Sequence, residues 1–169
     1  IIAIVGPTAS GKTDLGLFLA KELNGEIISA DSMQVYEGLD IGTAKIKPEA
    51  RTVPHHLIDV VKPDINFSVA DYHQLAEKAI LDIRKRGKRP IFVGGTGLYL
   101  QSVLDGLLFP EPNKDERLRH KLLTEAKELG NEYMFRRLLN CDKESARKIH
   151  PNDIRRIIRA LEVYIKTGI

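Results

Sequence analysis

The start of the chain joins an apolar run, a glycine-containing loop and a segment with helical composition. Residues 1–5 are apolar, and residues 14–20 are rich in leucine. Between them the chain reads Gly6-Pro7-Thr8-Ala9-Ser10-Gly11-Lys12-Thr13, which fits G-x-x-x-x-G-K-[ST] at every fixed position. Converging backbone N–H groups and a helix N-terminus suit an anion. The sequence therefore predicts a strand, a phosphate-binding loop (P-loop) and a helix.

The last two residues of this loop indicate what it holds. Lys12 can place an ammonium group beside the terminal phosphates, and Thr13 can offer a hydroxyl to Mg²⁺. Nothing in the loop demands adenine. We therefore expect residues 6–13 to bind a diphosphate or a nucleotide, with Mg²⁺ as the cofactor and Thr13 as its ligand.

The acid that ATPases place at the end of a second apolar strand is missing. The apolar run 90–93 ends in Gly94-Gly95-Thr96-Gly97, which carries no carboxylate. The other candidate strand, residues 26–30, ends before Asp31, which is followed by Ser32-Met33-Gln34. An acid there can act as a general base toward an acceptor. The pattern indicates group transfer rather than ATP hydrolysis.

Strand-like and helix-like segments alternate in the first two thirds of the chain, which predicts an α/β fold with a parallel sheet flanked by helices. Residues 37–67 hold many Gly and Pro residues and are interpreted as loops. The expected strands cover residues 1–5, 26–30 and 90–93. The expected helices cover residues 12–23, 68–86 and 98–105.

Composition changes at Pro110-Glu111-Pro112, which predicts a P-loop core over residues 1–110 and a basic helical segment over 111–169. The first part holds 12 Lys and Arg against 13 Asp and Glu, and the second part 14 against 10. Apolar stripes indicate one helix that ends near Gly130, a second around residue 134 and a third from residue 154. An excess of cations confined to one part suits a polyanion such as nucleic acid, although a solvated helical surface explains it equally well.

Two sets of residues are candidates for substrate contact. Asp31 and Thr96 follow the second and third expected strands, and ligands of open α/β sheets bind at the carboxyl ends of the strands. Alternatively, each of these two residues only caps a helix. Arg155, Arg156 and Arg159 form a group of guanidinium side chains that suits phosphate, or else a solvated face that pairs with Glu162.

Other features limit the setting. No run approaches the roughly 18 apolar residues of a membrane span. One cysteine, Cys141, excludes an internal disulfide and fits a reducing cytosol. His55 and His56 are adjacent and point in different directions, which favours packing or substrate contact over a shared metal. We expect a cytoplasmic monomer without a membrane partner.

Taken together, these residues resemble the tRNA dimethylallyltransferase (tRNA isopentenyltransferase) family along the whole chain. The matching segments are residues 6–13, Asp-Ser-Met-Gln-Val-Tyr at 31–36, Asp-Ile-Gly-Thr-Ala-Lys at 40–45, Pro-His-His-Leu-Ile-Asp at 54–59, Ser-Val-Ala-Asp-Tyr at 68–72, Val-Gly-Gly-Thr-Gly-Leu-Tyr at 93–99, His-Pro-Asn-Asp at 150–153 and Arg-Ala-Leu-Glu-Val at 159–163. Chains of this family are longer, so we expect these residues to be part of a larger protein that returns to the core.

The resemblance implies transfer of a dimethylallyl group from dimethylallyl diphosphate to N6 of the adenosine beside the anticodon of tRNA. The P-loop then holds the leaving diphosphate with Mg²⁺, Asp31 is the general base, and Thr96 lies beside it. The anticodon stem-loop is the implied partner. The residues that the resemblance assigns to tRNA binding are Asp31, Ser32, Met33, Gln34, Thr96, Arg119, Arg155, Arg156, Ile157, Ile158 and Arg159.

Two other functions are compatible with parts of the pattern. A P-loop kinase of a nucleotide or small metabolite would bind ATP at residues 6–13 and use Asp31 to activate a hydroxyl. A basic RNA-binding module would use the loop only for a structural anion. Neither accounts for all the matching segments.

Overall fold

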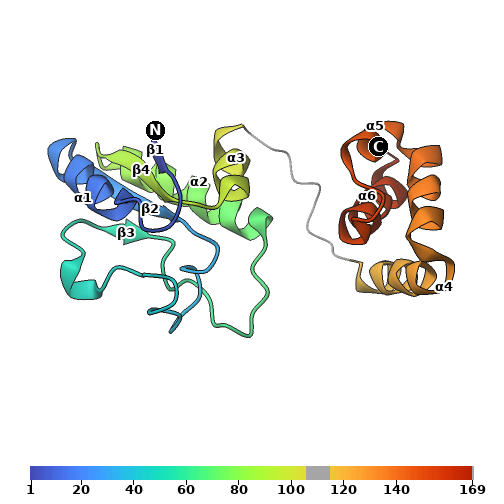
Figure 1. Ribbon diagram of the computed structural model, residues 1–169. Helices are drawn as coiled ribbons and strands as arrows, with labels where there is room; N and C mark the ends of the chain where they lie inside the picture. Colours follow the sequence, from blue (N-terminus) through green and yellow to red (C-terminus); the bar gives the residue numbers. More distant parts are fainter. Residues whose placement is uncertain (106–114, 169) are drawn as a thin grey trace. The chain divides into compact units, whose positions relative to one another are not determined.

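The computed structural model describes residues 1–105 and 115–168 (Figure 1). The chain divides into two compact units, Ile1–Phe109 and Pro110–Ile169. The segment Pro110-Glu111-Pro112, predicted as the boundary, lies outside the described residues.

The first unit contains a four-stranded sheet in which every pairing is parallel, in the order β1-β4-β2-β3. This arrangement confirms the predicted α/β fold. The strands are β1 (Ile2–Val5), β2 (Gly25–Ala30), β3 (His55–His56) and β4 (Arg89–Gly94). The short strand β3 was not predicted; it lies in the stretch interpreted as loops.

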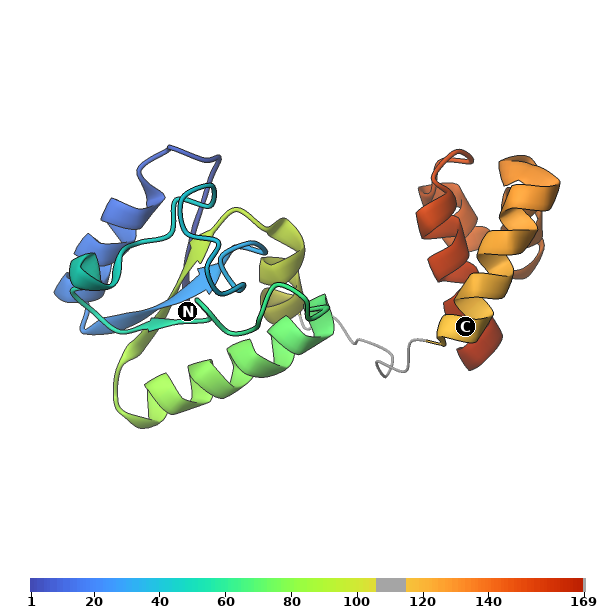
Figure 2. The same cartoon turned by 90° about the horizontal axis from the view of Figure 1, so that it is seen from below.

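Helices cover both faces of this sheet (Figure 2). Alternate residues of β2 point to opposite faces, so Ile27 packs in a cluster with Ala20 of the first helix. Ile28 packs on the other face with Ala76 and Ile80 of the second. The unit therefore has three layers. Its helices are α1 (Lys12–Glu22), α2 (Val69–Lys85) and α3 (Gly97–Leu104), with a 3₁₀ turn η1 at Pro48–Ala50.

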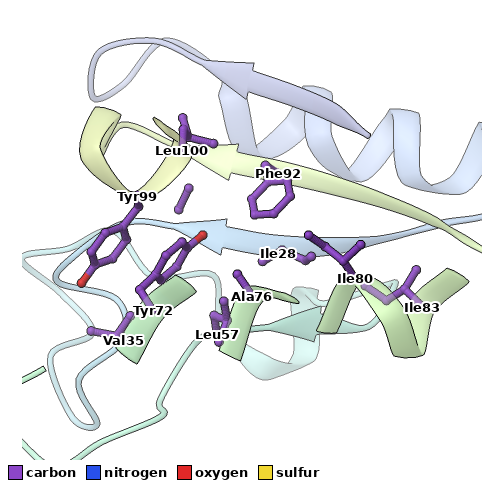
Figure 3. Close-up of a cluster of buried hydrophobic side chains, with 11 residues drawn as sticks. Ile28, Val35, Leu57, Tyr72, Ala76, Ile80, Ile83, Phe92, Tyr99 and Leu100 are labelled. Atoms are coloured by element: carbon purple, nitrogen blue, oxygen red, sulfur yellow. The ribbon is translucent and has the colours of Figure 1, made fainter. Parts of the chain in front are cut away.

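The larger core of the first unit lies between the sheet, α2 and α3 (Figure 3). Helix α2 begins with a capping box in which Ser68 and Asp71 satisfy each other's backbone N–H groups. Its first turn carries Tyr72, which stacks on Tyr99 of α3 with ring centroids 3.8 Å apart. The Tyr72 hydroxyl donates to the carbonyl of Ser29 at 3.0 Å, so this core reaches the carboxyl end of β2.

A buried carboxylate lies near the opposite end of the sheet. Glu26 of β2 is fully buried and accepts hydrogen bonds from Arg86 and Lys88, the latter at 2.8 Å. His56 Nε2 lies 2.7 Å from it. Hydrogen bonds from Arg86 hold the pKa of Glu26 well below its ordinary value near 4.5. Three side chains, those of Arg86, Lys88 and His56, thus surround one buried charge.

We expect Glu26→Gln to lower the free energy of unfolding by about 2 kcal/mol at neutral pH, since hydrogen bonds to a charged group contribute about that much. Because the folded-state pKa is lowered, the contribution is complete above the unfolded pKa and is lost as the pH falls below about 4.5. Urea unfolding at pH 7 and at pH 3 measures both effects. The exposed Glu22→Gln is the control, and equal losses at both pH values would contradict the assignment.

The second unit is helical and has its own core. It contains α4 (Glu116–Cys141), α5 (Lys143–Lys148) and α6 (Ile154–Thr167). The sequence predicted one helix that ends near Gly130 and a second around residue 134, and α4 does consist of two helices that meet at a kink at Gly130, where the backbone has φ 84° and ψ 167°. The fully or largely buried side chains of this core are Leu122, Ala126, Met134, Leu138, Ala146, Ile157, Ile158 and Leu161.

Two further features bear on the setting of the protein. Among the described residues, no helix has both the length and the apolar character needed to cross a membrane. Cys141 is a free, half-buried thiol whose pKa is raised by burial.

Candidate functional site

Three strands end at the same level of the sheet. Val5 of β1 pairs with Gly94 of β4, and Gly94 pairs in turn with Ala30 of β2. A Cβ atom at Gly94 would lie 2.2 Å from the Ala30 carbonyl oxygen, so only glycine permits this close approach. The register places the segments that follow these strands at one edge: the P-loop, the turn at Asp31 and the segment before α3.

The P-loop has the backbone expected of an anion-binding turn. Gly11, the residue before α1, has a left-handed φ of 78°, and Ala9 has φ 62°. Lys12 donates hydrogen bonds to the carbonyl of Pro7 and, at 3.4 Å, to Ser10 Oγ. The ammonium group therefore lies over its own loop, at the N-terminus of α1.

Thr13 fits the predicted role of a Mg²⁺ ligand. Its side chain is exposed in the first turn of α1, and within the described residues its hydroxyl makes no hydrogen bond. The described part of the chain contains no group of three or more His, Cys, Asp or Glu side chains that could hold a metal alone. Mg²⁺ usually keeps several waters and binds substrate phosphates with few protein ligands. One hydroxyl beside a bound diphosphate suits this chemistry.

Asp31 has one oriented oxygen and one available oxygen. Its Oδ1 accepts from the backbone N–H groups of Met33, at 2.9 Å, and Gln34, at 3.3 Å. Within the described residues no hydrogen bond reaches Oδ2, and the residue is partly exposed. The alternative of a helix cap is not realised, because residues 32–35 form a turn and no helix begins there. Oδ1 holds this turn, while Oδ2 is left for a substrate.

Thr96 links the two rim segments to each other. Its Oγ1 accepts from the backbone N–H of Ser32 at 3.0 Å, and its own N–H donates to the carbonyl of Ala30. Thr96 occupies the N-cap position of α3, yet its side chain makes no cap hydrogen bond. The hydroxyl proton therefore remains available for a substrate atom near Asp31.

Both polar atoms of the Gln34 side chain form hydrogen bonds within the protein. Its Oε1 accepts from Ser29 Oγ at 3.0 Å, and its Nε2 donates to the carbonyl of Thr43 at 3.1 Å. These bonds fasten the loop after Asp31 to the segment 39–45. The neighbouring Met33 is exposed. Of these two predicted tRNA contacts, Met33 has the freer side chain.

A second fastening holds the same loop. Lys45 is buried and donates to Asp40 at 2.8 Å, to Asp59 at 2.6 Å and to the carbonyl of Tyr36 at 2.9 Å. The stretch 37–67, interpreted from sequence as loops, is therefore fixed by internal polar contacts. Sequence reasoning missed Lys45, and its only signal was a matching segment at 40–45.

His55 is a residue for which the sequence left packing and substrate contact open. It lines a cavity of about 20 Å³ together with Thr13, Ser29 and Gln34. Its Nδ1 lies 2.7 Å from the Val53 carbonyl, and its buried Nε2 has no hydrogen-bond partner among the described residues. Burial lowers the pKa of this imidazole, which favours a neutral ring that can accept a hydrogen bond.

The predicted tRNA-binding arginines lie in the helical unit and line two separate hollows. Arg156 and Arg159 line a hollow of about 520 Å³ between α5 and α6, together with Lys148. Arg155 lines another of about 460 Å³ beside His150. Arg155 is exposed and, among the described residues, makes no ion pair. The alternative considered for this group, an ion pair with Glu162, is found at Arg159, at 3.0 Å. Arg119 also forms an ion pair with Glu162, at 2.6 Å.

The side chains of Ile157 and Ile158 do not face solvent. Both are almost completely buried in the core of the helical unit. The expectation that these two side chains contact tRNA is therefore corrected, because the apolar stripe of α6 turns them toward the core. Any contact from this segment comes from the arginines on either side.

Comparisons with known proteins identify close relatives. A family model described as IPP transferase matches residues 34–169. The chain is 54% identical over 169 residues to a tRNA dimethylallyltransferase of Halothermothrix orenii, which is 99% of this chain and 52% of that protein. It is 56% identical to a tRNA dimethylallyltransferase of Thermoanaerobacter pseudethanolicus, with 99% and 54% covered.

Solved structures of proteins with related names also match this chain. The full-length tRNA isopentenylpyrophosphate transferase of Bacillus halodurans matches with a TM-score of 0.65 and 50% identity, over 99% of this chain and 55% of that one. A eukaryotic dimethylallyltransferase acting on tRNA matches with a TM-score of 0.86 and 37% identity, over 100% and 42%. The chain spans about half the length of the curated relatives it matches.

Proposed function

The chain belongs to the IPP transferase family, and on that premise we propose that its protein transfers a dimethylallyl group from dimethylallyl diphosphate to N6 of the adenosine beside the anticodon of tRNA, in the cytoplasm. The observation that carries the proposal is the common edge at which the P-loop and Asp31 lie. A phosphate-binding loop beside an acid with one available oxygen suits transfer from a phosphorylated donor to an acceptor.

The P-loop holds the diphosphate of the donor in this proposal. Backbone N–H groups around Gly11 and the N-terminus of α1 face the anion, and Lys12 adds a full positive charge. Thr13 would hold Mg²⁺, which when bound offsets negative charge on the diphosphate. These groups stabilise the charge that grows on the leaving group as its bond to carbon breaks.

The acceptor approaches from Asp31. The bond from C1 of the dimethylallyl group to the diphosphate oxygen breaks, and a bond from C1 to N6 of adenine forms. Oδ2 of Asp31 takes the proton that N6 loses, while Met33 and Gln34 hold Oδ1 in place. The hydroxyl of Thr96 can donate to an acceptor atom of the base.

In this proposal the helical unit binds the RNA. An adenine in the anticodon loop must leave its stack to reach an active site, at a cost of a few kcal/mol that phosphate contacts offset. Arg155 and Arg156 are exposed on α6 and offer planar guanidinium groups to phosphates.

Replacing both Arg155 and Arg156 by Ala should weaken tRNA binding and reduce its salt dependence. Each lost phosphate contact lowers the slope of log K against log salt by about 1, and the loss is similar for different tRNA sequences. Filter binding between 50 and 300 mM salt measures the slope. The control is Arg136→Ala, an exposed arginine of α4 that pairs with Glu132. An unchanged slope in the double variant would argue against phosphate contacts on this part of α6.

A ligand-stabilisation experiment separates this proposal from a small-molecule kinase. The naturally encoded protein is heated with Mg²⁺ and, in turn, pyrophosphate, dimethylallyl diphosphate and ATP. A ligand present at 100 times its Kd adds about 2.7 kcal/mol of stability, which raises Tm by several degrees. We expect stabilisation by pyrophosphate and the prenyl diphosphate. Stabilisation by ATP alone would favour the kinase.

A further inference from the structure

The buried carboxylate of Glu162 joins two helices of the second unit. Glu162 lies on α6 and is fully buried. Its Oε2 accepts from Arg119 of α4 at 2.6 Å and from Arg159 of α6 at 3.0 Å. Its Oε1 is also buried and has no hydrogen-bond partner among the described residues. One oxygen atom thus holds two guanidinium groups as close neighbours.

The two arginines keep most of their hydrogen-bonding capacity. Their side chains are 36% and 49% exposed, whereas that of Glu162 is 0% exposed. A guanidinium has five N–H donors, and the contact with Glu162 uses one from each. The remaining donors can therefore bind a phosphate in solvent, which the buried carboxylate cannot reach.

The charges of this triad explain why the carboxylate is needed. Two guanidinium groups so close together repel each other, and each arginine loses about 2 kcal/mol of rotamer entropy when it is fixed. Burial raises the pKa of Glu162, but hydrogen bonds from Arg119 and Arg159 outweigh burial, and its pKa lies below the ordinary value. The carboxylate is thus charged at neutral pH, so it relieves the repulsion and fixes both side chains before RNA arrives.

We propose that Glu162 is a positioning residue that presents Arg119 and Arg159 as a preformed pair to the phosphates of the RNA substrate. The inference rests on the proposed function, because it assumes that the helical unit binds tRNA. Fixing a side chain in its bound orientation raises affinity by removing the entropy cost from the binding step. The ion pairs with Glu162 therefore belong to the binding surface rather than standing as an alternative to it.

Removing the charge of Glu162 distinguishes a positioning role from a general electrostatic effect, because the two predict changes in tRNA affinity of opposite sign. Loss of a negative charge near an RNA-binding surface should strengthen tRNA binding if only net charge matters. If Glu162 positions the arginines, Glu162→Met should weaken tRNA binding about tenfold and make the salt slope shallower. Glu162→Gln, which keeps one acceptor oxygen, should lie between the wild type and Glu162→Met.

The matched control is Glu132→Gln, which removes an exposed carboxylate of α4 that pairs with Arg136. It changes net charge by the same amount without touching Arg119 or Arg159, so affinity should stay equal or rise slightly. Circular dichroism and Tm confirm that each variant is folded. Equal or tighter binding by both Glu162 variants, with folding intact, would overturn the proposal.

A second measurement covers the case in which Glu162→Met does not fold. Arg119→Ala and Arg159→Ala are combined in a double-mutant cycle, in the wild type and in Glu162→Gln. Because both arginines share one oxygen, their effects on tRNA affinity should be non-additive by about fivefold in the wild type and closer to additive in Glu162→Gln, which keeps one acceptor oxygen. Additive effects in the wild type would contradict the proposal. If Arg155 and Arg156 also prove irrelevant to tRNA binding, the proposed function of the helical unit fails instead.

Discussion

Asp31→Asn should lower the rate of prenyl transfer about 1000-fold and leave tRNA affinity unchanged, since general-base catalysis contributes 10²- to 10⁴-fold. The asparagine keeps Oδ1, which accepts from Met33 and Gln34, so the turn after β2 is preserved. Only the oxygen that takes the proton is replaced by an amide nitrogen. Single-turnover transfer to tRNA measures the effect, because it isolates the chemical step from product release.

The control for this substitution is Asp64→Asn, an exposed carboxylate on the segment between β3 and α2. It makes the same chemical change and should leave the rate as in the wild type. Turnover near the wild-type rate in Asp31→Asn would contradict the assignment of Asp31 as general base. A parallel loss of tRNA affinity and rate would instead assign Asp31 to binding.

Lys12→Met should reduce transfer about 100-fold and weaken binding of dimethylallyl diphosphate, while tRNA affinity remains unchanged. The ammonium group lies over the P-loop, where it hydrogen-bonds to Pro7 and Ser10. Removing one charged donor aimed at developing negative charge costs 10²- to 10³-fold. Isothermal titration with pyrophosphate and Mg²⁺, together with steady-state kinetics, gives the two effects separately.

Lys21→Met is the matched control, because Lys21 lies on the same helix, in its last turn, and is exposed. It changes the net charge equally but lies away from the loop in sequence. Donor affinity in Lys12→Met that equals the wild type would show that the P-loop lysine does not touch the diphosphate. The loop would then need another role.

The sequence predicted the sheet well for a physical reason. Strands buried on both faces of a parallel sheet have apolar runs, and residues 1–5 and 90–93 have this form, while residues 26–30 keep an apolar centre at Ile27 and Ile28. Strand β3 is too short for such a signal, because it consists of two histidines among loop residues. The rim could also be predicted, because the carboxyl ends of parallel strands meet at one edge.

What the sequence could not predict are contacts between residues distant along the chain. Arg86 and Lys88 both bind the buried Glu26, some 60 residues earlier. Glu162 was expected to pair only with its helical neighbours, and the contact from Arg119 required the fold of the second unit. Hydrophobic periodicity specifies which face of a helix is buried, but it says nothing about which polar group meets a buried charge.

The division of α4 at Gly130 could be predicted from the sequence. Glycine favours left-handed backbone at helix ends, and Gly130 adopts φ 84° between the two helical segments. Local sequence does not contain the tertiary packing, in which Met134 and Leu138 of the second segment join the same core as Leu122 of the first.

The central claim is that the P-loop holds a prenyl diphosphate as leaving group while Asp31 deprotonates an adenine of tRNA. The most direct measurement incubates the naturally encoded protein with Mg²⁺, labelled dimethylallyl diphosphate and unmodified tRNA, and then analyses the nucleosides by mass spectrometry. We predict label on N6 of the adenosine beside the anticodon, with one diphosphate released per group transferred and no requirement for ATP. Absence of label from tRNA, together with ATP-dependent phosphorylation of a small molecule, would contradict the account.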